Sequence, residues 1–204
     1  MKHKQMKINN CEQQTEEWFE ARKGKMSSSN SQAVGANGKG LETYCKKIVM
    51  ETLCKEVERY TNPDMERGNE LEPLARKTYI IESKNKVEEV GLIEYNDFFV
   101  SSPDGLIDDN GMVEIKCMND QNHFNFIIDG KIQSKWMWQM QGQLLASGRD
   151  WVDFVAYNPN FDKSLIVVRV EKDLVKQEKL IVGIEKGTEL IKEIKQKYAE
   201  STTK

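Results

Sequence analysis

The pattern of apolar residues changes near Val87, and this change limits the possible folds more than any other feature of the chain. Before it, apolar residues recur at helical spacing over 41–59 and again over 65–83, with Asn62-Pro63 as the break. After it, short β-favouring runs are separated by turn sequences such as 108–111. These runs cover 87–95, 98–102 and 112–117. The sequence therefore predicts helices followed by an antiparallel meander.

Further helices and strands are marked on both sides of the meander. Thr15 followed by two glutamates is typical of a helix start, so a short helix is expected over 16–23, with Gly24 as its stop. The serine-rich run 27–31 offers N-cap residues to a second short helix that ends near Gly35, with a flexible serine linker as the alternative. Downstream, the pattern predicts a helix over 134–146, strands over 151–157 and 164–170, and a lysine-rich helix over 174–198.

This order of elements is typical of an α/β or α+β domain with a central mixed sheet flanked by helices. We expect a single domain over 1–204, with a core over about 14–171 and an amphipathic helix over about 172–199. No apolar run approaches the ~20 residues of a membrane helix. The basic N-terminus is not followed by an apolar segment, so we expect no membrane span, no secretory signal and a cytoplasmic location.

Charge and rare residues narrow the chemistry. The chain has 30 Lys and Arg against 33 Asp and Glu, and residues 61–120 hold 14 of the acids with only 6 basic residues. An acidic chain does not coat nucleic acid by general basicity, but it can hold cations locally. The four cysteines form no CxxC pair and are expected to be buried thiols rather than zinc ligands. With only His3 and His123, the latter expected at the surface or in a helix cap, catalysis would rest on carboxylates.

One strand carries an acid and a base on the same face. Glu114 and Lys116 are two residues apart, whereas the alternate positions between and around them are apolar. Asp104 ends the preceding segment, and a hairpin of this length can bring Glu114 back beside it. Two adjacent carboxylates repel unless a cation lies between them, and Mg²⁺ prefers carboxylate oxygens. The pattern favours a Mg²⁺ site beside an ammonium group; a simple turn followed by a solvated strand face is the alternative.

Flanking residues complete a pattern known from one group of nucleases. Gly68, Glu72 and Ala75 lie on the helix upstream, Ser102-Pro103-Asp104-Gly105 and Glu114-Ile115-Lys116 follow, and Gln139 and Gln141 lie on the helix downstream. In this order, the set resembles the phage lambda exonuclease and YqaJ-type viral recombinase group of the PD-(D/E)XK nucleases, over about residues 14–170. The resemblance implies a restriction-endonuclease-like core, a mixed sheet between helices.

The resemblance also implies roles for individual residues. Asp104, Glu114 and the Ile115 carbonyl would bind Mg²⁺, or Mn²⁺ in its place, and Glu72 would complete the acidic cluster around a second ion. Lys116 would assist the nucleophile. Gln139 would hold the reacting strand or water, since Gln139 and Gln141 cannot both face one site from a helix. An exposed helix acid is the alternative for Glu72.

A phosphate pocket is implied by the same group. Trp18 and Arg22 share a helix face, Ser29 lies in the serine-rich run, and Ser102 lies two residues before Asp104. In the family these positions form the pocket for a 5′-phosphorylated DNA end; pairing of Arg22 with a neighbouring glutamate is the alternative. The lambda-type members are ring-shaped trimers that degrade the 5′-ended strand of linear duplex DNA.

The expected function is therefore a Mg²⁺-dependent 5′-to-3′ exonuclease, encoded by a phage or prophage, whose 3′ single-stranded tails feed a single-strand annealing recombinase. Three other functions are compatible with parts of this pattern. An iron-sulfur nuclease requires a cysteine quartet near the C-terminus, whereas the last cysteine here is Cys117. An endonuclease of the same fold conflicts with the end-binding residues. A catalytically inactive DNA-binding module conflicts with the intact Asp104, Glu114 and Lys116.

Overall fold

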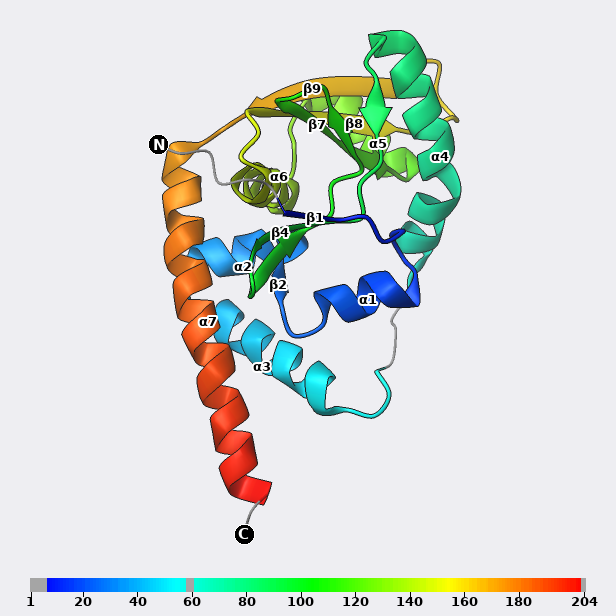
Figure 1. Cartoon of the computed structure of the whole chain (residues 1–204). Helices are drawn as coiled ribbons and strands as arrows, with labels where there is room; N and C mark the ends of the chain where they lie inside the picture. The colour runs from blue at the N-terminus through cyan, green and yellow to red at the C-terminus, as the bar shows by residue number, and fades with distance from the viewer. Residues whose placement is uncertain (1–6, 58–60, 203–204) are drawn as a thin grey trace.

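The computed structural model describes residues 7–57 and 61–202 (Figure 1). Its first helix, α1 (Glu16–Arg22), begins where the sequence predicts, because the Thr15 hydroxyl accepts a hydrogen bond from the Trp18 backbone N–H. Gly24, with φ of 77°, follows the end of the helix. The serine-rich run forms the 3-10 helix η1 (Ser28–Asn30) and leads into α2 (Ser31–Ala36), so the linker alternative is wrong.

The predicted bounds agree with the structure for one of the next two helices and differ from it for the other. Helix α3 (Lys39–Leu53) is shorter than predicted, because the backbone becomes extended at Cys54. The end of the predicted helix at 58–59, like His3, lies outside the described residues. Helix α4 (Pro63–Ser83) begins at the predicted break, where the Asn62 side chain accepts a hydrogen bond from the Met65 backbone N–H.

The expected mixed α+β fold is confirmed, but the strands are divided between two sheets. The smaller sheet has the order β1-β4-β5-β2 and the larger has the order β3-β6-β7-β8-β9. The smaller sheet comprises β1 (Lys7–Asn9), β4 (Leu92–Asn96), β5 (Phe99–Ser101) and β2 (Met26–Ser27). The larger comprises β3 (Val87–Glu88), β6 (Gly105–Ile107), β7 (Gly111–Cys117), β8 (Trp151–Tyr157) and β9 (Leu165–Glu171).

The single strand expected over 87–95 is interrupted, and its two halves belong to different sheets. A β-carbon on Gly91 would lie 1.9 Å from the Cys11 carbonyl oxygen, so the backbone of the N-terminal segment crosses this point closely. The meander expected from the sequence is thus two antiparallel hairpins, β4–β5 and β6–β7, each in its own sheet.

Strand β7 is central to the larger sheet and has a helix on each face. It pairs antiparallel with β6 and parallel with β8, with Glu114 opposite Phe154. The parallel pairing requires a crossover, which α5 (Asp120–Asp129) and α6 (Ser134–Ser147) provide. Helix α4 packs Ala75 and Tyr79 against one face of the sheet. Helix α6 packs against the other face and lies between the two sheets (Figure 1).

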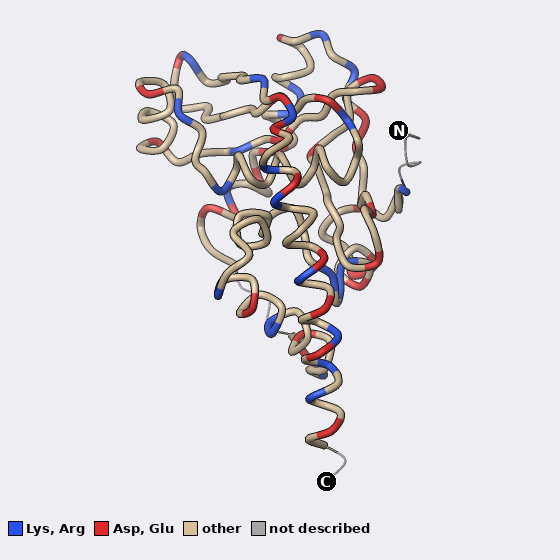
Figure 2. Tube along the Cα trace, turned by 90° about the vertical axis from the view of Figure 1, so that its left-hand side faces the viewer, with Lys and Arg blue, Asp and Glu red and all other residues tan. Residues whose placement is uncertain are grey.

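The last helix, α7 (Leu174–Thr202), is long and runs along the side of the molecule against α2 and α3 (Figure 1). A β-carbon on Gly183 would lie 2.0 Å from the Val34 carbonyl oxygen, so the glycine permits the close approach to α2. Figure 2 shows basic and acidic residues alternating along α7. Among the residues that the structure describes, no helix is both long enough and apolar enough to span a membrane.

The structure corrects the expectations for one histidine and two cysteines. His123 is fully buried on α5, a helix that the polar sequence did not reveal, and its Nε2 atom lies 2.9 Å from the Lys163 carbonyl oxygen. Cys54 is exposed rather than buried, because it follows the end of α3, and Cys117 is only half-buried. Cys11 and Cys45 are buried thiols, as expected.

Candidate active site

The β6–β7 hairpin brings Asp104 beside the strand that carries Glu114. The Asp104 backbone N–H donates to the Val113 carbonyl at 3.2 Å, and the Ile115 backbone N–H donates to Asp104 Oδ2 at 2.6 Å. The backbone and the side chain of Asp104 therefore make two successive hydrogen bonds to strand β7. Because this carboxylate is fixed at the level of Ile115, it lies next to both Glu114 and Lys116 in the strand.

Glu114 is almost completely buried, with 1% of its side chain exposed, so the solvated strand face is excluded. Its Oε1 atom accepts hydrogen bonds from Lys116 Nζ and, at 2.6 Å, from Gln139 Nε2. Its Oε2 atom accepts a hydrogen bond from Gln143 Nε2 at 2.5 Å. Gln139 thus faces the candidate site as predicted. Gln143 was missed, although its spacing of four residues from Gln139 places it on the same face of α6.

Gln141 points elsewhere, which agrees with the argument that only one of the pair Gln139 and Gln141 could face the site. Its Nε2 donates to the Glu171 carbonyl at 2.8 Å, and its Oε1 accepts the Asp173 backbone N–H at 2.8 Å. Gln141 therefore fixes the junction between β9 and α7 to helix α6.

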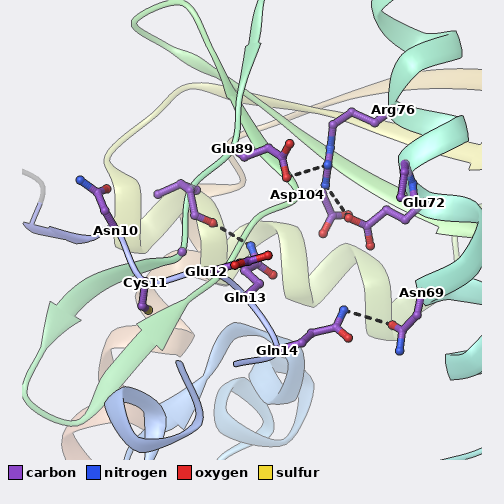
Figure 3. A pocket seen from close by; sticks show the side chains of 13 residues that line it. Asn10, Cys11, Glu12, Gln13, Gln14, Asn69, Glu72, Arg76, Glu89 and Asp104 are labelled. Atoms are coloured by element: carbon purple, nitrogen blue, oxygen red, sulfur yellow. Dashed lines mark hydrogen bonds and ion pairs between the residues drawn. The ribbon is translucent and has the colours of Figure 1, made fainter. Parts of the chain in front are cut away.

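Glu72 lies on α4 at the edge of a pocket with a volume of about 410 Å³ (Figure 3). Its Oε1 accepts a hydrogen bond from Arg76 Nη2 at 2.5 Å, and Arg76 Nη1 lies 2.7 Å from Glu89 Oε2. Asp104 lines the same pocket, as does Gln13 of the N-terminal segment, whose Nε2 donates to the Pro103 carbonyl at 3.0 Å. Glu72 is not a free exposed acid: its side chain is 28% exposed and paired. Arg76, which the sequence analysis did not single out, partly neutralises this pocket.

The charges of these groups influence one another strongly. Burial, together with the negative charges of Glu114 and Glu72, raises the pKa of Asp104 well above its usual range. Burial also raises the pKa of Glu72, against the opposing effect of Arg76. For Lys116, burial lowers the pKa, but Glu114 and Asp104 raise it by more, so the net shift is upward. Lys116 is therefore a charged ammonium at neutral pH.

The donor set fits a hard divalent cation, although the side chains do not yet converge on one. Within 7–57 and 61–202, no three Asp, Glu, His or Cys side chains are grouped closely enough to hold a metal ion as they stand. Glu114 is bound by Lys116 and two amides, and Glu72 is bound by Arg76. Burial and the neighbouring negative charges of Glu114 and Glu72 nevertheless raise the pKa of Asp104, and a cation bound beside it would favour its charged form.

Three of the four residues expected to bind a phosphate lie together. Trp18 Nε1 donates to Ser102 Oγ at 3.0 Å, and Arg22 Nη1 donates to the same oxygen at 3.3 Å. The Arg22 guanidinium lies over the Trp18 ring, 4.0 Å from its centroid. Among the described residues, no carboxylate forms an ion pair with Arg22, so the alternative in which it pairs with a glutamate is wrong. Burial lowers the pKa of Arg22.

Ser29 does not join this group in the described part of the chain. It is exposed, its Oγ lies 2.9 Å from Ser27 Oγ, and it accepts a hydrogen bond from Asn30 Nδ2 at 3.4 Å. Helix α2 has only six residues and no side-chain N-cap hydrogen bond. The structure therefore gives no support to the expected place of Ser29 in the phosphate pocket.

The fold and the site together define a class of protein. A mixed sheet between helices, with an aspartate directly before one strand and a Glu-x-Lys sequence on the adjoining strand, is the architecture of the PD-(D/E)XK nucleases. The model of the YqaJ-like viral recombinase domain matches residues 17–150. The chain belongs to this family.

Solved structures with the same fold include alkaline exonucleases. The LHK-Exo alkaline exonuclease from Laribacter hongkongensis is 36% identical over 91% of this chain and 99% of its own, with a TM-score of 0.80. Its complex with dAMP gives a TM-score of 0.82 at the same identity and coverage. A phage-related exonuclease from Haemophilus somnus 129PT, 14% identical over 85% of this chain and 96% of its own, has a TM-score of 0.65, which shows the fold alone. No curated protein sequence matches the chain significantly.

Proposed function

We propose that the protein is a Mg²⁺-dependent exonuclease that degrades the 5′-ended strand of linear duplex DNA and leaves 3′ single-stranded tails. The observation that carries the proposal is that one hairpin brings Asp104, Glu114 and Lys116 together. Ser102, whose hydroxyl accepts hydrogen bonds from Arg22 and Trp18, lies two residues before Asp104 in the sequence. The family and the similarity to LHK-Exo, described as an alkaline exonuclease, support exonuclease activity.

The carboxylates of Asp104 and Glu114, with the Ile115 carbonyl, would hold one cation, and Glu72 would help hold a second after leaving Arg76. Bound Mg²⁺, or Mn²⁺ in its place, supplies charge neutralisation at the phosphate and lowers the pKa of a water molecule. Lys116, as an ammonium held by Glu114, stabilises negative charge that develops during phosphodiester cleavage. Gln139 donates one N–H to Glu114 and has a second for the reacting strand or water.

The Arg22, Trp18 and Ser102 group would determine polarity. Its guanidinium has donors beyond the one that contacts Ser102, and no carboxylate in the described part of the chain neutralises it. A 5′-phosphate bound there would lie near Asp104 and so place the first linkage of that strand at the candidate metal site. The product tails would suit a single-strand annealing recombinase in the cytoplasm of a bacterial host, with the enzyme encoded by a phage or prophage.

Digestion of linear and closed-circular duplex DNA tests the proposal. With Mg²⁺, the linear form should be degraded and the circular form should persist, and EDTA should stop the reaction. Lys116→Ala should reduce the rate by at least ~100-fold, whereas the control Lys86→Ala, which alters an exposed lysine paired with Glu88, should retain it. Cleavage of the circular form would indicate an endonuclease instead. Loss of neither form would indicate an inactive DNA-binding module.

A further inference from the structure

Both oxygens of Glu114 are bound by amides from a single helix. Gln139 and Gln143 are four residues apart on α6 and donate to Oε1 and Oε2, respectively. The two amides differ in their surroundings, because Gln139 is half-buried and Gln143 is fully buried. Oε1 therefore lies on the accessible side, where Lys116 also contacts it, and Oε2 points into the interior.

Only one end of the Gln143 amide forms a hydrogen bond in the described part of the chain. Its Nε2 donates to Glu114, whereas its Oε1 is buried and has no hydrogen-bond partner among the residues that the structure describes. A buried carbonyl oxygen without a partner is unfavourable, so an apolar residue would suit this position better if only packing mattered. The neighbour Leu144 fills the core in that way and is also fully buried. The placement of Gln143 is consistent with a requirement for one donor at Oε2.

We propose that Gln143 is a positioning residue: its hydrogen bond to Glu114 Oε2 fixes the carboxylate so that Oε1 is presented to the cation. The inference rests on the proposed function, because it assumes that Glu114 binds the metal. A carboxylate held at one oxygen has fewer side-chain conformations, so less conformational entropy is lost when the other oxygen binds a cation. Gln139 lies at the accessible edge and is the one of the two amides that DNA can reach.

The test is calorimetric titration of Mn²⁺ into the protein without DNA. Gln143→Met keeps the length of the side chain but removes the donor, and Gln143→Asn keeps an amide that is too short to reach Glu114. For both variants we expect the Mn²⁺ dissociation constant to rise by about 10- to 100-fold, the usual effect of removing a group that orients a metal ligand. The control Leu144→Met changes packing in the adjacent buried position and should leave the dissociation constant close to that of the wild type. If Gln143→Met does not fold, Gln143→Asn carries the test.

Thermal unfolding of the same proteins separates positioning from packing. If Gln143 only fills the core, its substitution would lower the melting temperature in EDTA and leave the Mn²⁺ affinity unchanged. That result would overturn the inference and leave the proposed function intact. If high Mn²⁺ concentration restores the cleavage rate of Gln143→Met, the positioning role of Gln143 is supported. A wild-type protein that binds no Mn²⁺ would overturn both the inference and the proposed function.

Discussion

The Asp104 carboxylate accepts the backbone N–H of Ile115 at 2.6 Å, so one side chain both closes the β6–β7 hairpin and borders the pocket beside Glu72. Its two roles depend on different properties. Closing the hairpin requires only an acceptor oxygen, whereas binding a cation requires negative charge. Substitutions can therefore separate the structural role from the chemical one.

Asp104→Asn and Asp104→Ala should have different effects on stability and the same effect on activity. Asparagine retains an oxygen that can accept the Ile115 N–H, so its free energy of unfolding should stay close to that of the wild type. Alanine leaves this N–H without its acceptor and should cost about 1–3 kcal/mol. Both variants should lose nearly all nuclease activity. Urea unfolding and digestion of linear DNA measure the two effects, and an active Asp104→Asn protein would contradict the metal-ligand role.

Arg22 should confer a preference for 5′-phosphorylated ends. A charge-assisted hydrogen bond contributes about 1.5–3 kcal/mol, so wild-type protein should degrade phosphorylated ends about 10- to 100-fold faster than 5′-hydroxyl ends at subsaturating DNA. Arg22→Ala should abolish most of this difference. Arg22→Lys should also reduce it, because lysine cannot both stack on Trp18 and donate to Ser102 in the same planar geometry.

Lys23→Ala is the matched control for these variants, since Lys23 is the next residue but pairs with Glu20 near the surface. Its preference between the two ends should match that of the wild type. End-labelled duplexes report which strand is shortened first. Equal rates on both ends in the wild type, or release of nucleotides from the 3′ end, would refute the assigned polarity.

The protein should form a homotrimer that encloses its DNA. The net charge of −3 gives the chain little general attraction for nucleic acid, so a ring would keep it on the substrate. Light scattering should report three times the chain mass of 23.6 kDa at micromolar concentration. A strict monomer would contradict the trimer without affecting the assignment of Asp104, Glu114 or Lys116.

Tyr79 should make the protein sensitive to alkaline pH. Its hydroxyl donates to Asp153 Oδ2 at 2.7 Å, and burial together with Asp153 raises its pKa to about 12. In the unfolded chain a tyrosine releases its proton near pH ~10. Between these values the unfolded state binds fewer protons than the folded state, so stability is present below the lower value and is lost as pH rises toward the upper one.

Comparison with Tyr79→Phe isolates this contribution from that of other groups. The difference in unfolding free energy between wild type and variant should shrink by about 2 kcal/mol from pH ~9 to pH ~12. Urea unfolding at several pH values measures it. A difference that stays constant over this range would show that the Tyr79 hydroxyl does not keep its proton in the folded state.

Local patterns predicted the parts of the site that depend on neighbouring residues in the chain. The alternation of side chains along β7 put Glu114 and Lys116 on one face, and the turn at 108–111 indicated the return of the strand. Helical spacing separated Gln139 from Gln141. These relationships follow from the geometry of one strand, one hairpin and one helix, so they can be predicted without knowledge of distant contacts.

Other features depend on contacts between distant segments and were not predicted. The strand expected over 87–95 is interrupted at Gly91, where the backbone of the N-terminal segment passes close by at Cys11. Arg76 became important only because the fold places Glu89 opposite it. The burial of Glu114 depends on α6, which lies between two sheets, whereas the sequence suggested only one. No pattern within a single segment reveals such approaches.

The parallel pairing of β7 with β8 also determines when the site can form during synthesis. Asp104, Glu114 and Lys116 leave the ribosome together, but the amides that align Glu114 belong to α6, and the second neighbour of β7 ends only at Tyr157. A nascent chain that stops short of this point holds the acids and the ammonium without the strand and helix that fix them. The proposed nuclease centre therefore cannot assemble until the chain has been synthesised beyond Tyr157.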